Sequence, residues 1–289
     1  MVRKAIAAGQ FYPGNKVELE ESVKKMLSEA KKTTSKRVFG IISPHAGYAY
    51  SGRCAAFSYN AIKSQSFDTF IILGPNHTGR GKRISISGQD FEVPNGVAKN
   101  DKEFTGELAG IYGLNEDAHA SEHCIEAQLP FLLSIFKTVK IVPIVLSSCS
   151  HAECFELARD LEKIAKKLKR KACIIASSDF THYGPAYDYV PFSGTKEEIK
   201  KKLYALDEKA IKLIESMKAD KFFELSRDLT ICGAEAITVS MELCKMLGAL
   251  NRARHQARCT GAELLKYYTS GDVSGDYFNV VGYASIAFV

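Results

Sequence analysis

Apolar runs of strand length recur along this chain and constrain its fold more than any other feature. The runs are Val38–Ile42, Thr69–Leu73, Ile141–Leu146, Cys173–Ala176 and Val280–Phe288. Most of them are apolar at successive positions, so both faces of each strand should be covered by other parts of the protein. Such strands are typical of a sheet with helices on its two faces.

Amphipathic helical patterns separate these runs. They cover residues 17–32, 52–63, 122–136, 152–169, 197–217 and 231–248. We therefore expect an α/β fold, with a central, mostly parallel or mixed sheet flanked by helices on both faces, in a single domain over residues 1–289. Pro143 interrupts the third run, and because proline donates no ladder hydrogen bond, we expect an edge strand or a bulge there.

The composition excludes several classes of protein. Apolar residues make up 46% and charged residues 25% of the chain, which is ordinary for a globular protein and not for a disordered one. The net charge of +6 (39 basic minus 33 acidic residues) is mild and does not predict nucleic-acid binding. No apolar run reaches the roughly 18 residues of a membrane span, and the N-terminus lacks a signal-peptide core. We expect a cytoplasmic protein whose cysteines stay reduced.

Three of the apolar runs end in a short loop that carries a histidine. His45 follows the first run, His77 follows the second, and Asp179 and His182 follow the fourth. The carboxyl ends of parallel strands share one edge of a sheet, where α/β proteins bind their ligands. A lone loop histidine is usually a surface residue, but three in the same context favour one functional pocket.

A fourth loop adds a cysteine to this set. Thr230 is expected to cap the helical pattern 231–248, which places Cys232 in its first turn, where the helix dipole favours a metal-binding thiolate. The alternative is a small buried cysteine at a tight helix start. Cys244, deeper in the same pattern, is expected in the core, and Cys149 and Cys154 at a loop and a helix start.

Another cluster is Glu122-His123-Cys124-Ile125-Glu126. Within a helix, His123 and Glu126 would share a face. This spacing suits a carboxylate that steadies a histidine, and it equally suits plain helix surface. His119, His151 and His255 have polar surroundings in the sequence and are expected at the surface.

Six motifs occur in a fixed order along the chain: Ala8–Pro13, Pro44–Tyr48, Leu73–His77, Glu122–Glu126, Ser177–His182 and Thr230–Gly233. Together they resemble the Memo (mediator of cell motility) family, whose microbial members are known as protein B of the AmmeMemoRadiSam system. The resemblance spans essentially the whole chain. It implies a fold similar to that of class III extradiol dioxygenases, in which two histidines and a carboxylate hold Fe(II).

The resemblance also implies roles for individual residues. His45 and His77 would be metal ligands, and Cys232 would stand in place of the carboxylate. His182 would be the catalytic acid or base, with Asp179 beside it. The metal would be Fe(II) or copper, since a thiolate softens the ligand set.

His123, Glu126 and Tyr48 would lie behind the ligands or contact the substrate. The implied activity is that of a dioxygenase-like oxidoreductase acting on a small molecule, and the system name implies a radical-SAM protein as a partner.

Two other functions stay open on the sequence alone. A non-catalytic module could bind a peptide or a small acidic ligand, with Arg53 and Arg80 as contacts, although Phe11 stands where animal members of the family carry a tryptophan. A metal-dependent hydrolase would use His182 as its base.

Overall fold

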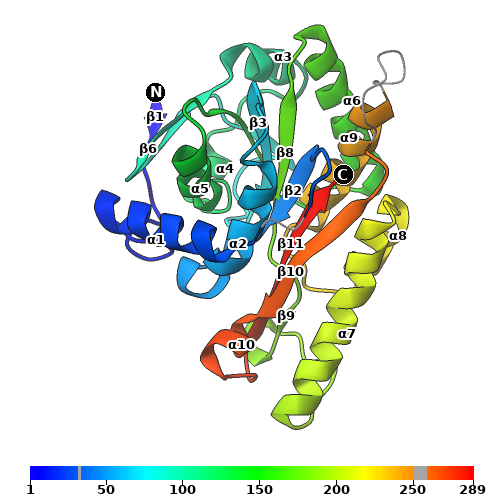
Figure 1. Ribbon diagram of the computed structural model, residues 1–289. Coiled ribbons are helices and arrows are strands. Elements are labelled where there is room, and N and C mark those ends of the chain that lie inside the picture. The colour runs from blue at the N-terminus through cyan, green and yellow to red at the C-terminus, as the bar shows by residue number, and fades with distance from the viewer. Residues whose placement is uncertain (32–33, 250–258) are drawn as a thin grey trace.

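The computed structural model describes residues 1–31, 34–249 and 259–289. Its strands are β1 (Val2–Arg3), β2 (Gly40–Ser43), β3 (Thr69–Pro75), β4 (Ile84–Ile86), β5 (Asp90–Val93), β6 (Gly96–Asn100), β7 (Lys140–Leu146), β8 (Ala172–Ser177), β9 (His182–Tyr183), β10 (Ala262–Thr269) and β11 (Val280–Phe288). Across these residues the strands form one 11-stranded sheet (Figure 1). Their order is β1-β5-β6-β7-β3-β8-β2-β11-β10, with β4 paired to β7 and β9 to β11.

The middle of this sheet is parallel, and antiparallel pairs lie on both sides of it. Strands β6, β7, β3, β8 and β2 run in the same direction. Strand β11 is antiparallel to β2, and β10, the last strand in the order, is antiparallel to β11 and carries an irregularity between Leu264 and Lys266. The predicted α/β fold with a mostly parallel, mixed sheet is therefore confirmed.

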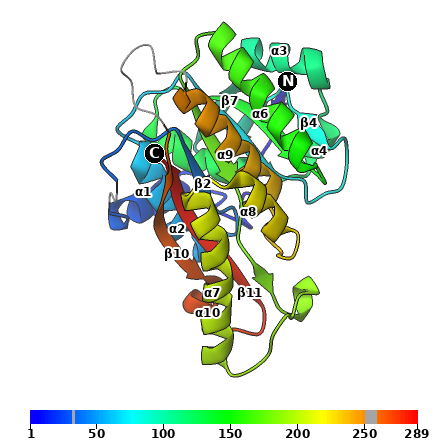
Figure 2. The ribbon, with the colours of Figure 1, turned by 90° about the vertical axis from the view of Figure 1, so that its right-hand side faces the viewer.

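Helices cover both faces of the sheet. They are α1 (Lys16–Glu29), α2 (Tyr48–Ile62), α3 (Lys102–Tyr112), α4 (Asp117–Ala120), α5 (Leu129–Ile135), α6 (His151–Lys167), α7 (Lys196–Glu215), α8 (Ala219–Ser226), α9 (Ala234–Ala249) and α10 (Ser270–Ser274). The 3-10 helices are η1 (Glu126–Gln128) and η2 (Pro185–Tyr187). Helices α1, α2 and α5 lie on one side in Figure 1, and α6 to α9 lie together on the side that faces the viewer in Figure 2.

Alternate residues of each central strand pack against opposite helix layers. Ile41 of β2 and Ile175 of β8 belong to the core beneath α1, α2 and α5. Their neighbours Ile42 and Ile174 belong to the core beneath α6 and α9. All four side chains are fully buried, and burial of each contributes roughly 1.5–3 kcal/mol. This two-sided burial explains why these strands are apolar at successive positions.

Pro143 lies inside the sheet and not at an edge, so the edge prediction is wrong. Strand β7 pairs along one side with β3 in an unbroken register. Along the other side it pairs with β6 up to Ile141 and with β4 from Ile144. Pro143 falls between these two partners, where its missing N–H costs no ladder bond.

The helix predicted over residues 122–136 begins later than expected. Residues 122–123 belong to no regular element, residues 124–125 form a turn, η1 starts at Glu126, and α5 follows from Leu129. The Glu122 carboxylate accepts the N–H groups of His123 and Cys124, at 2.8 and 3.0 Å, and this local bonding holds the turn. The shared helix face predicted for His123 and Glu126 is therefore wrong.

Candidate metal centre

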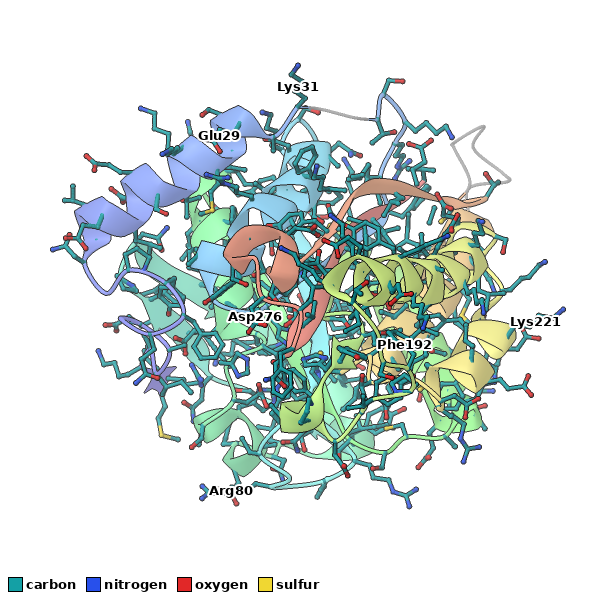
Figure 3. The ribbon with its side chains drawn as sticks, turned by 90° about the horizontal axis from the view of Figure 1, so that it is seen from below. Glu29, Lys31, Arg80, Phe192, Lys221 and Asp276 are labelled. Carbon is teal, nitrogen blue, oxygen red and sulfur yellow. The ribbon has the colours of Figure 1, made fainter. Side chains whose placement is uncertain are left out.

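The loops that carry the predicted histidines meet at the carboxyl ends of the parallel strands. His45 lies two residues beyond β2, His77 two residues beyond β3, and Asp179 two residues beyond β8. The backbone N–H of His45 donates to Asp179 Oδ1 at 2.9 Å, and the ring centroids of His45 and His77 are 5.2 Å apart. Figure 3 views this end of the molecule from below.

Three imidazoles form the centre of the site. His45, His77 and His123 each offer one ring nitrogen, and the three nitrogens lie within 4.8 Å of one another. His123 comes from the segment before η1, and its ring lies 5.3 Å from that of His45 and 4.9 Å from that of His77. In the described part of the chain no other such group of possible metal ligands occurs.

Oxygen atoms behind the imidazoles orient the rings. His45 Nδ1 lies 3.0 Å from Ser177 Oγ at the end of β8. Glu122 Oε1 lies 3.0 Å from His77 Nδ1 and 3.3 Å from His123 Nδ1, so one carboxylate oxygen serves two rings. A histidine held through Nδ1 presents Nε2 as its free nitrogen, and oxygen partners of this kind are typical of metal-ligating histidines.

Glu122 is a residue of the site that was not predicted from the sequence. Its side chain is 1% exposed and also accepts the backbone N–H of His77 at 2.6 Å. The sequence contains one indication of this role, because Glu122 directly precedes His123 in the motif Glu122–Glu126. A carboxylate beside a ligand histidine often orients the imidazole ring.

Burial keeps two of the three imidazoles neutral next to an ionised carboxylate. Burial, and then the nearby His77, lower the pKa of His45 to about 3. Burial, and then His45, lower the pKa of His123 to about 4. Burial also lowers the pKa of His77, but the hydrogen bond and charge of Glu122 outweigh it and raise that pKa above its ordinary value. Burial alone would raise the pKa of Glu122, but the hydrogen bond and charge of His77 lower it to about 2. Neutral imidazole is the form that binds a metal.

Cys232 lies against the histidine group, with its Sγ 3.4 Å from His45 Nε2. It does not lie in the first turn of α9, which begins two residues later at Ala234. Burial raises the pKa of the Cys232 thiol well above its usual range, and the charge of Asp179 adds to this effect. These surroundings favour the neutral thiol, because burial outweighs the effect of the helix end. The role of Cys232 as a metal-bound thiolate stays a prediction.

Thr230 is not a helix cap. It lies four residues before α9, its hydroxyl donates to the His182 carbonyl at 2.6 Å, and it accepts the His182 N–H at 2.9 Å. The ring of His182 is held as well, with Nδ1 2.9 Å from the carbonyl oxygens of both Phe180 and Thr230. Because carbonyl oxygens only accept, Nδ1 carries a proton and the lone pair of the neutral ring is on Nε2.

Asp179 is 3% exposed, and its carboxylate binds the opposite loop. Oδ1 accepts the N–H groups of His45 and Ala46, at 2.9 and 3.4 Å, and Oδ2 lies 3.9 Å from His45 Nε2. Backbone carbonyls, and not Asp179, hold the ring of His182. Burial raises the pKa of Asp179, and the neighbouring His182 opposes this rise.

Glu126 and Tyr48 stabilise the surroundings of the histidines. Glu126 is fully buried and accepts bonds from Arg3, from the Tyr12 hydroxyl and from the N–H groups of residues 6 and 7. The Tyr48 hydroxyl donates to the Ala127 carbonyl at 2.7 Å. The N-terminal segment held in this way places the ring of Phe11 4.4 Å from that of His123. Whether Glu126 or Tyr48 contacts a substrate stays a prediction.

Comparison with known proteins agrees with the motifs. A family model described as Memo-like protein matches residues 3–287. The chain belongs to the Memo-like protein family. A MEMO1 family protein from Nitrosopumilus maritimus is 37% identical over the full length of both chains. MEMO1 family proteins from Pyrococcus furiosus and Methanocaldococcus jannaschii are both 36% identical, with at least 98% of each chain covered.

His119 and His151 of this Memo-like protein stand outside the cluster. The surface prediction for His119 is wrong, because the residue is 1% exposed and its Nε2 lies 3.0 Å from the Ser85 carbonyl oxygen. His151 is half-buried at the start of α6, and His255 lies outside the described residues. Cys244 is buried within α9 as expected, and Cys154 lies near the start of α6, as predicted.

The two arginines considered as ligand contacts are at the surface. Arg53 Nε lies 3.5 Å from a carboxylate oxygen of Glu29, and both side chains are largely exposed. Arg80 lies at the rim of Figure 3 and points away from the protein. Among the described residues, no helix is long and apolar enough to cross a membrane.

Proposed function

We propose that this Memo-like protein is a metal-dependent oxidoreductase that holds iron or copper through His45, His77 and His123, with Cys232 as a fourth ligand. The proposal rests on one observation: three imidazole nitrogens lie within 4.8 Å of one another, close enough to share an ion. Ser177 and Glu122 orient the three rings. Imidazole suits both iron and copper, and a cysteine sulfur favours copper or a more covalent iron site.

The distance between the nitrogen and sulfur donors fits a shared ion. With bonds of about 2.1 Å to nitrogen and about 2.3 Å to sulfur, as for zinc, a tetrahedral ion holds these two ligands about 3.6 Å apart. His45 Nε2 and Cys232 Sγ are 3.4 Å apart. Because the thiol must lose its proton to bind, metal uptake should release a proton. The bound ion would supply redox activity.

His182 is the proposed proton acceptor. Its Nδ1–H is committed to two backbone carbonyls, which leaves Nε2 free to take a proton from a substrate and to return it. The ring of Tyr187 lies edge-on to that of His182 at a centroid distance of 5.0 Å and forms one wall beside it. The Asp179 carboxylate, next to His45, stabilises positive charge that develops in the site.

The proposal extends to substrate, partner and compartment. We expect a small-molecule substrate with two adjacent oxygen atoms, a radical-SAM protein of the same system as a partner, and a cytoplasmic location. Co-purification of the tagged radical-SAM protein with this chain at native expression levels tests the partnership. Recovery of the two proteins in separate fractions would argue against it.

Metal content tests the proposed ligands. Untagged protein is loaded anaerobically with Fe(II) or copper, desalted, and analysed by inductively coupled plasma mass spectrometry. We expect one ion per chain, and a loss of about tenfold or more in metal affinity for His45→Ala and for His123→Ala. His151→Ala, which alters a half-buried histidine outside the cluster, is the matched control. Equal metal content in His45→Ala and the control would overturn the site.

Turnover tests the proposed activity. Metal-loaded protein is assayed for dioxygen uptake with a panel of small molecules that carry adjacent hydroxyl or carbonyl groups. His182→Ala should keep its metal and lose about 10²–10⁴-fold in rate. Turnover that does not depend on dioxygen would indicate a hydrolase and contradict the oxidoreductase proposal.

A further inference from the structure

Asp207 is a fully buried carboxylate in the middle of α7, and the proposed chemistry does not use it. In the described part of the chain, no lysine, arginine or histidine forms an ion pair with it. Burial raises the pKa of Asp207 to about 6, although hydrogen bonds from Thr181 and Tyr267 counter part of this effect. An isolated buried carboxylate is costly, so its presence calls for a structural or functional reason.

The contacts of Asp207 lead to the loop beside the metal centre. Oδ1 accepts both the hydroxyl and the N–H of Thr181, at 2.5 and 3.3 Å. Oδ2 accepts the Tyr267 hydroxyl at 2.6 Å. Thr181 lies between Phe180, whose carbonyl accepts from His182 Nδ1, and His182 itself. One carboxylate on α7 therefore anchors the backbone next to the proposed proton acceptor.

Strand β11 is shaped to let this carboxylate approach. The Gly282 N–H donates to the Thr181 carbonyl at 3.0 Å, and the Phe180 N–H donates to the Gly282 carbonyl at 2.8 Å. A Cβ atom on Gly282 would lie 2.3 Å from Asp207 Oδ2, closer than atoms can pack. The segment that carries His182 is thus held by β11 on one side and by α7 on the other.

We infer that Asp207 is a positioning residue, which through Thr181 holds the Asp179–His182 segment so that the His182 ring stays protonated on Nδ1 and free on Nε2. The inference rests on the proposed role of His182 as proton acceptor. Without the two bonds to Thr181, the segment can shift, and the Phe180 and Thr230 carbonyls no longer hold the ring in one tautomer.

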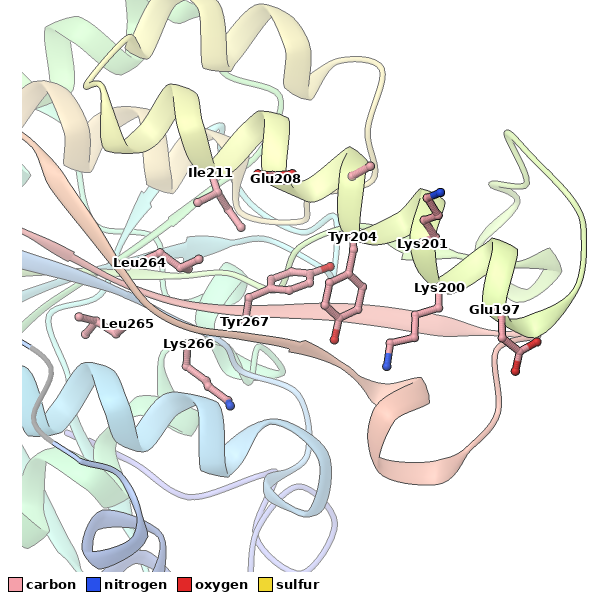
Figure 4. A pocket seen from close by; sticks show the side chains of 11 residues that line it. Glu197, Lys200, Lys201, Tyr204, Glu208, Ile211, Leu264, Leu265, Lys266 and Tyr267 are labelled. Atoms are coloured by element: carbon pink, nitrogen blue, oxygen red, sulfur yellow. The ribbon is translucent and has the colours of Figure 1, made fainter.

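The same carboxylate links this segment to a groove on the outside of the protein. Tyr267 of β10 lines a groove of about 890 Å³ between α7 and β10. Figure 4 shows Tyr267 beneath α7 and beside Tyr204, and the two rings meet edge-on at a centroid distance of 4.8 Å. Tyr267→Phe removes the hydrogen bond from the Tyr267 hydroxyl to Asp207 Oδ2 and leaves both bonds from Thr181 to Oδ1. It therefore separates the effect of the Tyr267 bond on Asp207 from the effect of the Thr181 bonds.

The test compares Asp207→Ala with Asp207→Asn. Asparagine keeps an oxygen that can accept both Thr181 bonds, and its amide can donate to the Tyr267 oxygen. Nitrogen-15 NMR of the histidine rings reports the tautomer of His182, whose signals are identified by their loss in His182→Ala. We expect a single Nδ1–H tautomer in wild type and Asp207→Asn, and a mixture in Asp207→Ala. Turnover should fall about 100-fold in Asp207→Ala and largely recover in Asp207→Asn.

Two controls keep the outcomes distinct. Glu208→Ala changes the next, exposed residue of α7 and should alter neither readout. Should Asp207→Ala fail to fold, Thr181→Val removes the hydroxyl from the other end of the same hydrogen bond. A folded Asp207→Ala or Thr181→Val protein with the wild-type His182 tautomer would overturn the inference. The NMR readout needs no turnover, so it stands even where wild type shows no dioxygen chemistry and the proposed function fails.

Discussion

The buried carboxylate of Glu126 gives the sharpest prediction for stability. Glu126→Gln should lower the free energy of unfolding by about 3–5 kcal/mol, the usual cost of breaking a buried ion pair from one side. The Glu126 and Arg3 side chains are 0% and 6% exposed, and their charged atoms lie 2.6 Å apart. A glutamine of the same size leaves the Arg3 guanidinium buried without a counter-charge.

Hydrogen-bond geometry supports this magnitude. Glu126 Oε1 accepts the Ala7 N–H at 2.9 Å and the Tyr12 hydroxyl at 2.5 Å, while Oε2 accepts from Arg3. Glutamine has one acceptor oxygen, so its amide group must face either Arg3 or the N-terminal donors. Each unsatisfied buried group costs about 1–3 kcal/mol, more when it is charged, which agrees with the estimate above.

Denaturant unfolding followed by circular dichroism measures the effect. Glu92→Gln is the matched control, because Glu92 pairs with Lys4 at 2.7 Å but their side chains are 40% and 74% exposed. We expect the control to cost less than about 1 kcal/mol. If Glu126→Gln costs no more than Glu92→Gln, the buried network does not anchor the N-terminal segment and the reasoning fails.

Three further changes test other parts of the structure. Glu122→Gln should weaken metal binding about 10–100-fold in a competition titration with a chelator, because the carboxylate orients two imidazoles; unchanged affinity would contradict this role. The pKa of Asp207 is raised from 3.8 to about 6, so the folded protein keeps this proton longer than the unfolded chain. Its contribution should therefore lower stability by about 2 kcal/mol as pH rises from 4 to 6, and urea unfolding of Asp207→Asn should lack this fall. Gly74→Ala places a Cβ 2.4 Å from Cys124 Sγ and should cost about 1–3 kcal/mol by thermal unfolding, whereas Gly106→Ala, with open space around it in α3, should not destabilise.

The sequence was informative where local pattern and tertiary surroundings agree. Apolar runs correctly located β3, β7, β8 and β11, because strands covered on both faces must be apolar throughout. The loops after β2, β3 and β8 also came together as predicted, since parallel strands end at one edge. Other strands were missed because they are short or only partly apolar: β1, β4, β5, β6, β9 and β10.

Other features depend on contacts that no local pattern contains. Helical spacing placed Glu126 beside His123, but the Glu122 side chain bonds its own backbone neighbours and turns the chain there. The thiolate predicted for Cys232 followed from a helix start, yet segments more than 50 residues away bury this residue, and burial raises the pKa of its thiol. Asp207 carried no sequence signal, because its partner Thr181 lies on a distant loop.

The two edges of the sheet have a consequence for the protein at high concentration. At one edge, the irregularity in β10 between Leu264 and Lys266 breaks the regular row of backbone groups, and Glu215 accepts the Leu264 N–H at 3.2 Å. At the other edge, β1 is only two residues long. Long, flat edges recruit strands from neighbouring molecules, whereas short or bulged edges offer them little to pair with. A large sheet is thereby closed to growth from chain to chain, which protects the protein against strand-mediated aggregation.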